Sequence, residues 1–131
     1  MIDYAALGRK VHIHYPYLAK ELITVPDCTE VEIIDQLFTE YATIQSKPAT
    51  KSEETYFKLV FIGAILKLYD PDFYDIKKKI KSGLRKKLSK TLSCDASLIS
   101  HNLKIVNNYI DVYPAFRNEV SYVYSELKKL L

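Results

Sequence analysis

The stretch from Tyr56 to Tyr69, YFKLVFIGAILKLY, constrains the fold of this chain more than any other feature. Its apolar side chains occupy nearly every face of a helix, so other parts of the protein must cover it on several sides. The run has 14 residues and contains two Lys. It is therefore short of the roughly 20 apolar residues that a membrane-spanning helix needs. The sequence predicts a buried central helix and no membrane partner.

Apolar residues at helical spacing also precede this run. A first amphipathic helix is predicted from about Glu30 to Gln45, with Thr29 as its N-cap. Its apolar stripe consists of Ile34, Leu37, Phe38, Tyr41 and Ile44. The polar segment from Ser46 to Ser52 follows as a linker, and Ser52 is predicted to cap the central helix.

Two further helices are predicted after the central run. Asp70 and Pro71 are typical of a helix start, so a basic helix is expected from Pro71 to about Lys81. A final helix is expected after Tyr113 and Pro114. Its apolar stripe consists of Phe116, Val120, Val123, Leu127 and Leu130. Only three Gly and five Pro among 131 residues leave few sites for hairpin turns, which also favours helices.

Charge is distributed unevenly along the chain. Residues 1–70 carry seven basic and ten acidic side chains, a net −3, whereas residues 71–131 carry twelve and six, a net +6. Between residues 76 and 110, nine basic side chains are opposed by one acidic side chain, which leaves +8. A surface that binds phosphates needs such concentrated positive charge. We expect one domain over 1–131, in which an acidic half supports a basic half.

The segment from Leu84 to Ile110 predicts a basic helix, a short polar turn and a second helix with one polar face. In the first helix the leucines repeat every four residues, at Leu84, Leu88 and Leu92. In the second helix one stripe is apolar and consists of Ile99, Leu103, Val106 and Ile110. The leucines are expected to pack on that stripe. The fold predicted for the whole chain is therefore all-α, a compact bundle of about five or six helices containing a helix-turn-helix.

The polar face of the second helix suits contact with nucleic acid. Lys bonds to guanine acceptors or phosphate, Asn pairs with adenine, and Ser bonds to either kind of partner. The residues expected to face the bases are Ser97, Ser100, His101, Lys104 and Asn108. The basic residues expected to contribute to DNA binding, chiefly through phosphates, are Lys77, Lys78, Lys81, Arg85, Lys86 and Lys90.

Six positions of this segment carry a leucine followed by a small residue, a second leucine, and later an isoleucine followed by serine and a further leucine. They are Leu88, Ser89, Leu92, Ile99, Ser100 and Leu103. With them the segment resembles the helix-turn-helix of many bacterial transcriptional regulators, which implies DNA binding. Two residues depart from the pattern. Ser93 stands where Gly is usual in the turn, and Cys94 where a larger aliphatic residue is common. A residue other than Gly is disfavoured at positive φ.

The whole chain is also similar to small proteins carried by bacterial mobile elements and prophages, in the segments GLRKKLSKTLS, SLISHNLK and YPAFRNEV. This similarity implies an accessory or regulatory DNA-binding protein. We therefore expect a transcriptional regulator or a mobile-element accessory factor whose partner is double-stranded DNA. A homodimer is expected, because one short reading helix usually needs a second half-site for useful specificity.

Other kinds of chemistry find little support in the sequence. The chain has no Gly-rich phosphate loop and no HExxH, GxSxG or paired-carboxylate signature, so we expect no enzyme, no cofactor and no small-molecule substrate. His12 and His14 lack further ligands nearby in the sequence, so no metal site is expected. Cys28 and Cys94 have no paired spacing and are expected to be small buried thiols in a reducing cytoplasm.

Two alternatives use the same basic surface. In the first, the protein is an interaction module that docks an acidic partner, with the Leu98, Ile105 and Tyr109 side of the second helix packed on it. Burial of these three residues within the chain, beside an open Lys104 face, favours DNA. A Lys104 face covered by the chain itself would exclude the reading surface. The second alternative is RNA, because phosphate attraction does not distinguish the two polymers.

Overall fold

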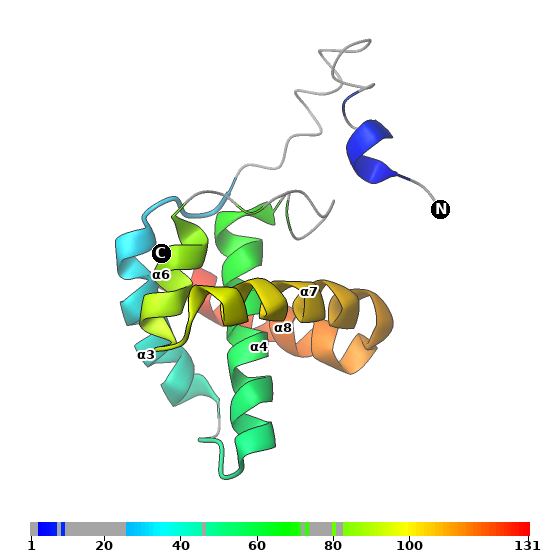
Figure 1. Ribbon diagram of the computed structural model, residues 1–131. Coiled ribbons are helices and arrows are strands. Elements are labelled where there is room, and N and C mark those ends of the chain that lie inside the picture. Colours follow the sequence, from blue (N-terminus) through cyan, green and yellow to red (C-terminus); the bar gives the residue numbers. More distant parts are fainter. Residues whose placement is uncertain are drawn as a thin grey trace.

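The computed structural model describes residues 3–7, 9, 26–45, 47–71, 73, 80 and 83–131. The protein is all-α, as predicted, and no strand occurs among these residues. The elements with described bounds are, in chain order, η1 (Val31–Ile33), α3 (Ile34–Ile44), α4 (Lys51–Tyr69), α6 (Leu84–Thr91), α7 (Ala96–Val112) and α8 (Pro114–Lys128) (Figure 1). Here η1 is a short 3-10 helix.

Some of the sequence predictions fall outside this part of the chain. The basic helix expected from Pro71 to Lys81 is described only at Pro71, Phe73 and Ile80. The three lysines Lys77, Lys78 and Lys81 and the pair His12 and His14 lie outside the described residues.

The two cysteines, Cys28 and Cys94, were expected to be buried. Both are half-buried free thiols.

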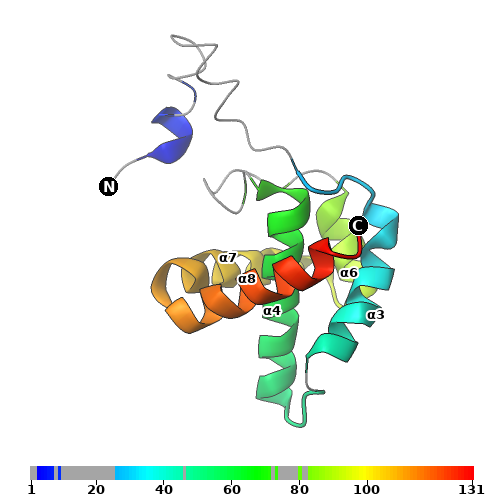
Figure 2. The same cartoon turned by 180° about the vertical axis from the view of Figure 1, so that it is seen from behind.

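Helix α4 is the centre of the bundle, as its sequence predicts. From Leu59 to Tyr69 every residue except Lys67 is buried, and α3, α7 and α8 all contact the helix. Figures 1 and 2 together show that α7 crosses one side of α4 and α8 crosses the other. Buried apolar side chains of α3, α4, α6, α7 and α8 belong to one hydrophobic cluster. Within the described residues, no helix is long and apolar enough to cross a membrane.

The start of α4 differs from the sequence prediction. The N-cap is Thr50, whose Oγ1 accepts a hydrogen bond from the Glu53 amide at 3.1 Å. In return, Glu53 Oε2 accepts a hydrogen bond from the Ala49 amide at 2.8 Å. Thr50 and Glu53 have the spacing of a capping box, but here the glutamate accepts from the amide of Ala49, the residue before the cap, and not from that of Thr50. The prediction of Ser52 as the cap is wrong, because the earlier threonine has a glutamate three residues later and Ser52 does not.

Helix α3 and the 3-10 helix before it occupy the segment predicted as one helix. The N-cap position is occupied by Glu30, one residue later than the predicted Thr29, so that prediction is wrong. The Glu30 side chain makes no capping hydrogen bond. The apolar stripe is confirmed: Ile34, Leu37 and Tyr41 are buried, and Phe38 and Ile44 are half-buried against the core. The Tyr41 hydroxyl donates a 2.6 Å hydrogen bond to the carbonyl of Phe57, which fixes α3 to α4.

The last helix, α8, packs against α4 and buries most of its predicted stripe. Phe116, Val120, Val123 and Leu127 are buried. Leu130 follows the end of the helix and is 51% exposed, so its predicted place in the stripe is wrong. The close approach of the two helices requires Gly63, since a Cβ there would lie 2.9 Å from Val120 Cγ2 and 3.2 Å from Val120 Cγ1.

Replacing Gly63 with Ala should therefore lower the free energy of unfolding by up to about 2 kcal/mol. Overpacking a core costs about 1–3 kcal/mol, whereas the higher helix propensity of Ala returns about 1 kcal/mol. Urea unfolding of Gly63→Ala, Val120→Ala and the double variant measures this. In the Val120→Ala background the two Cγ methyl groups of Val120 are absent, so Gly63→Ala should leave the free energy of unfolding unchanged or raise it. An equal loss in both backgrounds would contradict the steric explanation.

Candidate nucleic-acid interface

Helices α6 and α7 occupy the segment predicted as a helix-turn-helix and are joined by a turn at residues 92–95 (Figure 1). Gly83, with φ of 88°, precedes α6. Asp95 caps α7, and its side chain accepts a hydrogen bond from the Ser97 amide at 3.4 Å. The turn is held by the Cys94 amide, which donates to the carbonyl of Ser89 at 3.0 Å, and by the Ser89 hydroxyl, which donates to the carbonyl of Cys94. The small residue of the sequence pattern therefore ties the turn to α6.

Ser93 adopts the backbone conformation for which Gly is usual at this position. Its φ of 53° makes it the one residue other than Gly with positive φ in the described part of the chain. An L-residue in this left-handed conformation places its Cβ close to the following carbonyl. The departure noted in the sequence therefore does not prevent the turn, but it strains it.

The apolar residues predicted to lie between the two helices are buried, and α6 contacts α7. Leu84, Leu88 and Leu92 are buried, as are the four members of the α7 stripe, Ile99, Leu103, Val106 and Ile110. These residues all belong to the common hydrophobic cluster, which fixes the direction of α7 relative to α4. Asn102 is also buried, at 7% exposure, although the sequence pattern gave it no place in the stripe.

The polar face of α7 is open to solvent. Its exposed members are Ser97, His101, Lys104 and Asn108, together with the acidic residue Asp111 near the end of the helix. On α6, Arg85, Lys86 and Lys90 are exposed as well. Ser100 differs from the other predicted base-facing residues, because it is half-buried and its Oγ accepts a 2.9 Å hydrogen bond from Arg85 Nη1. The structure thus brings the described candidate residues together on adjoining parts of the α6–α7 unit.

The second apolar edge of α7 divides into two parts. Ile105 and Tyr109 are half-buried and pack against the core. The Tyr109 ring also meets Phe116 at a centroid separation of 5.5 Å. Leu98 is instead 46% exposed, near the start of the helix. The chain therefore partly covers two of these three residues, leaves Leu98 exposed and leaves Lys104 open to solvent, so the arrangement expected for DNA binding is met only in part.

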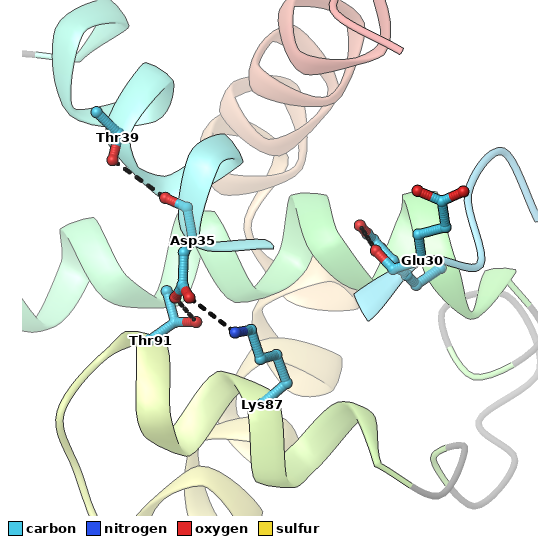
Figure 3. A network of polar contacts seen from close by, with 6 residues as sticks. Glu30, Asp35, Thr39, Lys87 and Thr91 are labelled. Carbon is cyan, nitrogen blue, oxygen red and sulfur yellow. Dashed lines mark hydrogen bonds and ion pairs between the residues drawn. The ribbon is translucent and has the colours of Figure 1, made fainter. Parts of the chain in front are cut away.

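One lysine of α6 is engaged by the acidic half of the chain. Lys87 Nζ donates a 2.7 Å hydrogen bond to Asp35 Oδ2, and Thr91 Oγ1 donates a 2.6 Å bond to Asp35 Oδ1 (Figure 3). Thr39 Oγ1 donates to the Asp35 carbonyl at 3.1 Å. Asp35 thus ties α3 to α6 at two points. The sequence gives no signal for this contact, because its partners lie about fifty positions apart.

These contacts determine the acidity of Asp35. Hydrogen bonds from Lys87 and then from Thr91 lower the pKa of its carboxyl group below the ordinary 3.8, and attraction to the Lys87 charge acts in the same direction. Desolvation of the carboxyl group opposes them and raises its pKa, by more than the attraction to the Lys87 charge lowers it. A carboxyl group whose pKa falls on folding stabilises the fold when ionised.

Comparison with protein-family models, with curated proteins and with solved structures finds no match to this chain. Its function is therefore inferred from the geometry and charge of the α6–α7 unit. The features that bear on it are the open polar face of α7 and the exposed cations of α6.

Ser93→Gly should raise the free energy of unfolding by about 0.5–1 kcal/mol. The left-handed conformation costs an L-residue about 1–2 kcal/mol, and the greater freedom of Gly in the unfolded chain offsets about half of that gain. Ser125→Gly is the matched control, because Ser125 is exposed within the regular helix α8 and the change there should destabilise. Urea unfolding compares the two. Destabilisation by both changes would contradict strain at Ser93.

Asp35→Asn should reduce the free energy of unfolding above about pH 4, where the native carboxylate is ionised. As pH falls below the ordinary pKa of 3.8 and through the lowered folded pKa, the native protein loses this contribution and the difference between the two proteins shrinks. Urea unfolding from pH 7 to pH 2 measures the effect. In a Lys87→Met background the pH-dependent difference should be much smaller. A difference that does not change with pH would contradict the ionic contribution.

Proposed function

We propose that this protein binds double-stranded DNA through the α6–α7 unit and acts as a transcriptional regulator or a mobile-element accessory factor. The single observation that carries the proposal is the open polar face of α7 beside the exposed cations of α6. Both surfaces rest on a buried apolar seam, so their relative position is fixed before any ligand binds. Preorganisation of this kind lowers the cost of binding.

The dimensions of α7 suit the major groove. A helix is about 10–12 Å across with its side chains, and the groove of B-form DNA is about 12 Å wide. The exposed polar side chains of α7 include a lysine, a histidine, an asparagine and a serine, which bond to base edges or phosphates, whereas the exposed carboxylate of Asp111 lies near the C-terminal end of the helix. In the proposed complex His101, Lys104 and Asn108 face the groove together with Ser97.

The cations of α6 have different roles in the proposed complex. Lys86 and Lys90 are exposed and form no ion pair within the described residues, so they are available to phosphates. Lys87 is engaged by Asp35 and contributes to the fold instead. The helix before the reading helix crosses the DNA backbone in helix-turn-helix complexes. The free lysines of α6 therefore supply the attraction that does not depend on sequence.

The proposed binding form is a homodimer. One reading helix contacts only a few base pairs, and helix-turn-helix proteins usually place two such helices in half-sites about 34–36 Å apart. Exposed apolar side chains at the junction of α7 with α8 and on α8 itself are consistent with a second copy of the chain. They include Val112, Tyr113 and Tyr122.

A protein-interaction module remains the second candidate because Leu98 is 46% exposed beside the basic surface. In that case the surface would dock an acidic partner, with Leu98 as its apolar anchor. Duplex DNA binding at low salt separates the two candidates. Absence of binding to both random and genomic fragments would exclude the DNA proposal and leave the interaction module. Stronger competition by structured RNA than by duplex DNA would identify RNA as the ligand.

In fluorescence anisotropy titrations, Lys86→Ala and Lys90→Ala should each weaken binding to all duplex sequences. Each should also reduce the slope of log affinity against log salt by about one, because one phosphate contact is lost. Lys87→Ala is the matched control on the same helix. It removes the same charge, but the slope should change less because Asp35 already neutralises this lysine. Equal effects of all three changes would contradict the assigned roles.

A further inference from the structure

Arg85 and Ser100 form a polar contact between the two helices of the unit. Arg85 lies in the first turn of α6 and is exposed, whereas Ser100 lies early in α7 and is half-buried. Arg85 Nη1 donates a 2.9 Å hydrogen bond to Ser100 Oγ. The exposed guanidinium is thus held against the helix that carries the open polar face.

This contact distinguishes Arg85 from the free lysines of α6. A lysine presents a point charge on a flexible chain, whereas a guanidinium presents five N–H donors in a planar fork. One donor of Arg85 is used by Ser100. The remaining donors are enough to bond to two oxygens of one phosphate. Because the side chain is already held, less rotamer freedom is lost when such a ligand binds.

We propose that Ser100 is a positioning residue, which holds Arg85 so that its guanidinium makes a two-point contact with one backbone phosphate of bound duplex DNA. This inference rests on the proposed function. It gives Ser100 a different role from the base contact predicted from the sequence. The hydroxyl is half-buried and already accepts the hydrogen bond from Arg85, so it acts through that residue.

A phosphate fits Arg85 better than a base edge does. Arg85 belongs to α6, and in helix-turn-helix complexes this first helix crosses the backbone while the second helix enters the groove. The neighbouring Lys86 is exposed on the same helix and adds positive field at the same position along the DNA. A two-point contact with phosphate is also independent of base identity.

The test measures Ser100→Ala in four backgrounds: the native chain, Arg85→Ala, Arg85→Lys and Lys86→Ala. Affinity for one duplex and for a panel of unrelated duplexes is titrated by anisotropy over a range of salt concentrations. Thermal unfolding of each variant sets a temperature at which all are folded. Arg85→Lys keeps the charge and removes the fork, and both changes at Arg85 fall on an exposed side chain.

In the native background, Ser100→Ala should weaken binding about three- to tenfold, the range that one hydrogen bond contributes. The loss should be equal for all duplexes, and the salt slope should not change because no charge is removed. In the Arg85→Ala and Arg85→Lys backgrounds, Ser100→Ala should have no further effect. In the Lys86→Ala background, its effect should remain complete. Arg85→Ala itself should lower the salt slope by about one, whereas Arg85→Lys should retain the slope and lose affinity.

Three results would overturn the proposal while leaving DNA binding intact. Ser100→Ala would weaken binding equally with and without Arg85, or would change sequence preference, as a direct base contact does. Arg85→Ala would relax the preference for guanine at one position, as a contact to a base edge does. Failure of the native protein to bind any duplex at low salt would instead remove the proposed function together with this inference.

Discussion

The burial of α4 is the constraint on which the rest of the structure depends. This helix is apolar on nearly all sides, so it must be covered by helices that come from both before and after it in the chain. The contact between Gly63 and Val120 lets α8 approach closely, while α7 closes the other side. Because α7 gives one face to this core, only its opposite face is left to solvent. The orientation of the candidate reading surface is therefore a consequence of core packing.

The acidic half of the chain acts on the basic half through one carboxylate. Asp35 holds Lys87 and Thr91, which lie one turn apart on α6. Ion pairs at exposed positions usually contribute little to stability, but here two donors of one helix share the same acceptor. The contact also removes one cation from the surface that would meet phosphate. The net charge of the segment therefore overstates the charge that is free to bind a polyanion.

The apolar periodicity of the sequence was sufficient to predict the all-α fold, the buried central helix, and the stripes of α3 and α7. The resemblance to the helix-turn-helix pattern, and not the periodicity, pointed to the strained turn residue, because Ser93 stands where that pattern has Gly. The two predicted helix caps, Thr29 and Ser52, were wrong. A side chain that is able to cap a helix does not by itself determine at which of several neighbouring residues the helix begins. The contacts of Asp35 with Lys87 and of Arg85 with Ser100 were not predictable. Each of these contacts joins two helices whose relative position is set by the whole core. The apolar periodicity within one helix does not indicate how that helix lies against another.

The four cations of α6 show how position divides like residues into different roles. Lys87 faces α3 and is paired, Arg85 faces α7 and is tethered, and the other two, Lys86 and Lys90, are exposed. This division follows from the buried leucines of α6, because they fix which side of the short helix faces each neighbour. A change in helix packing would therefore alter the charge pattern of the surface without changing any basic residue. For this reason the fold and the proposed binding surface cannot be separated: the same seam of leucines that completes the core determines which positive charges remain available to a ligand.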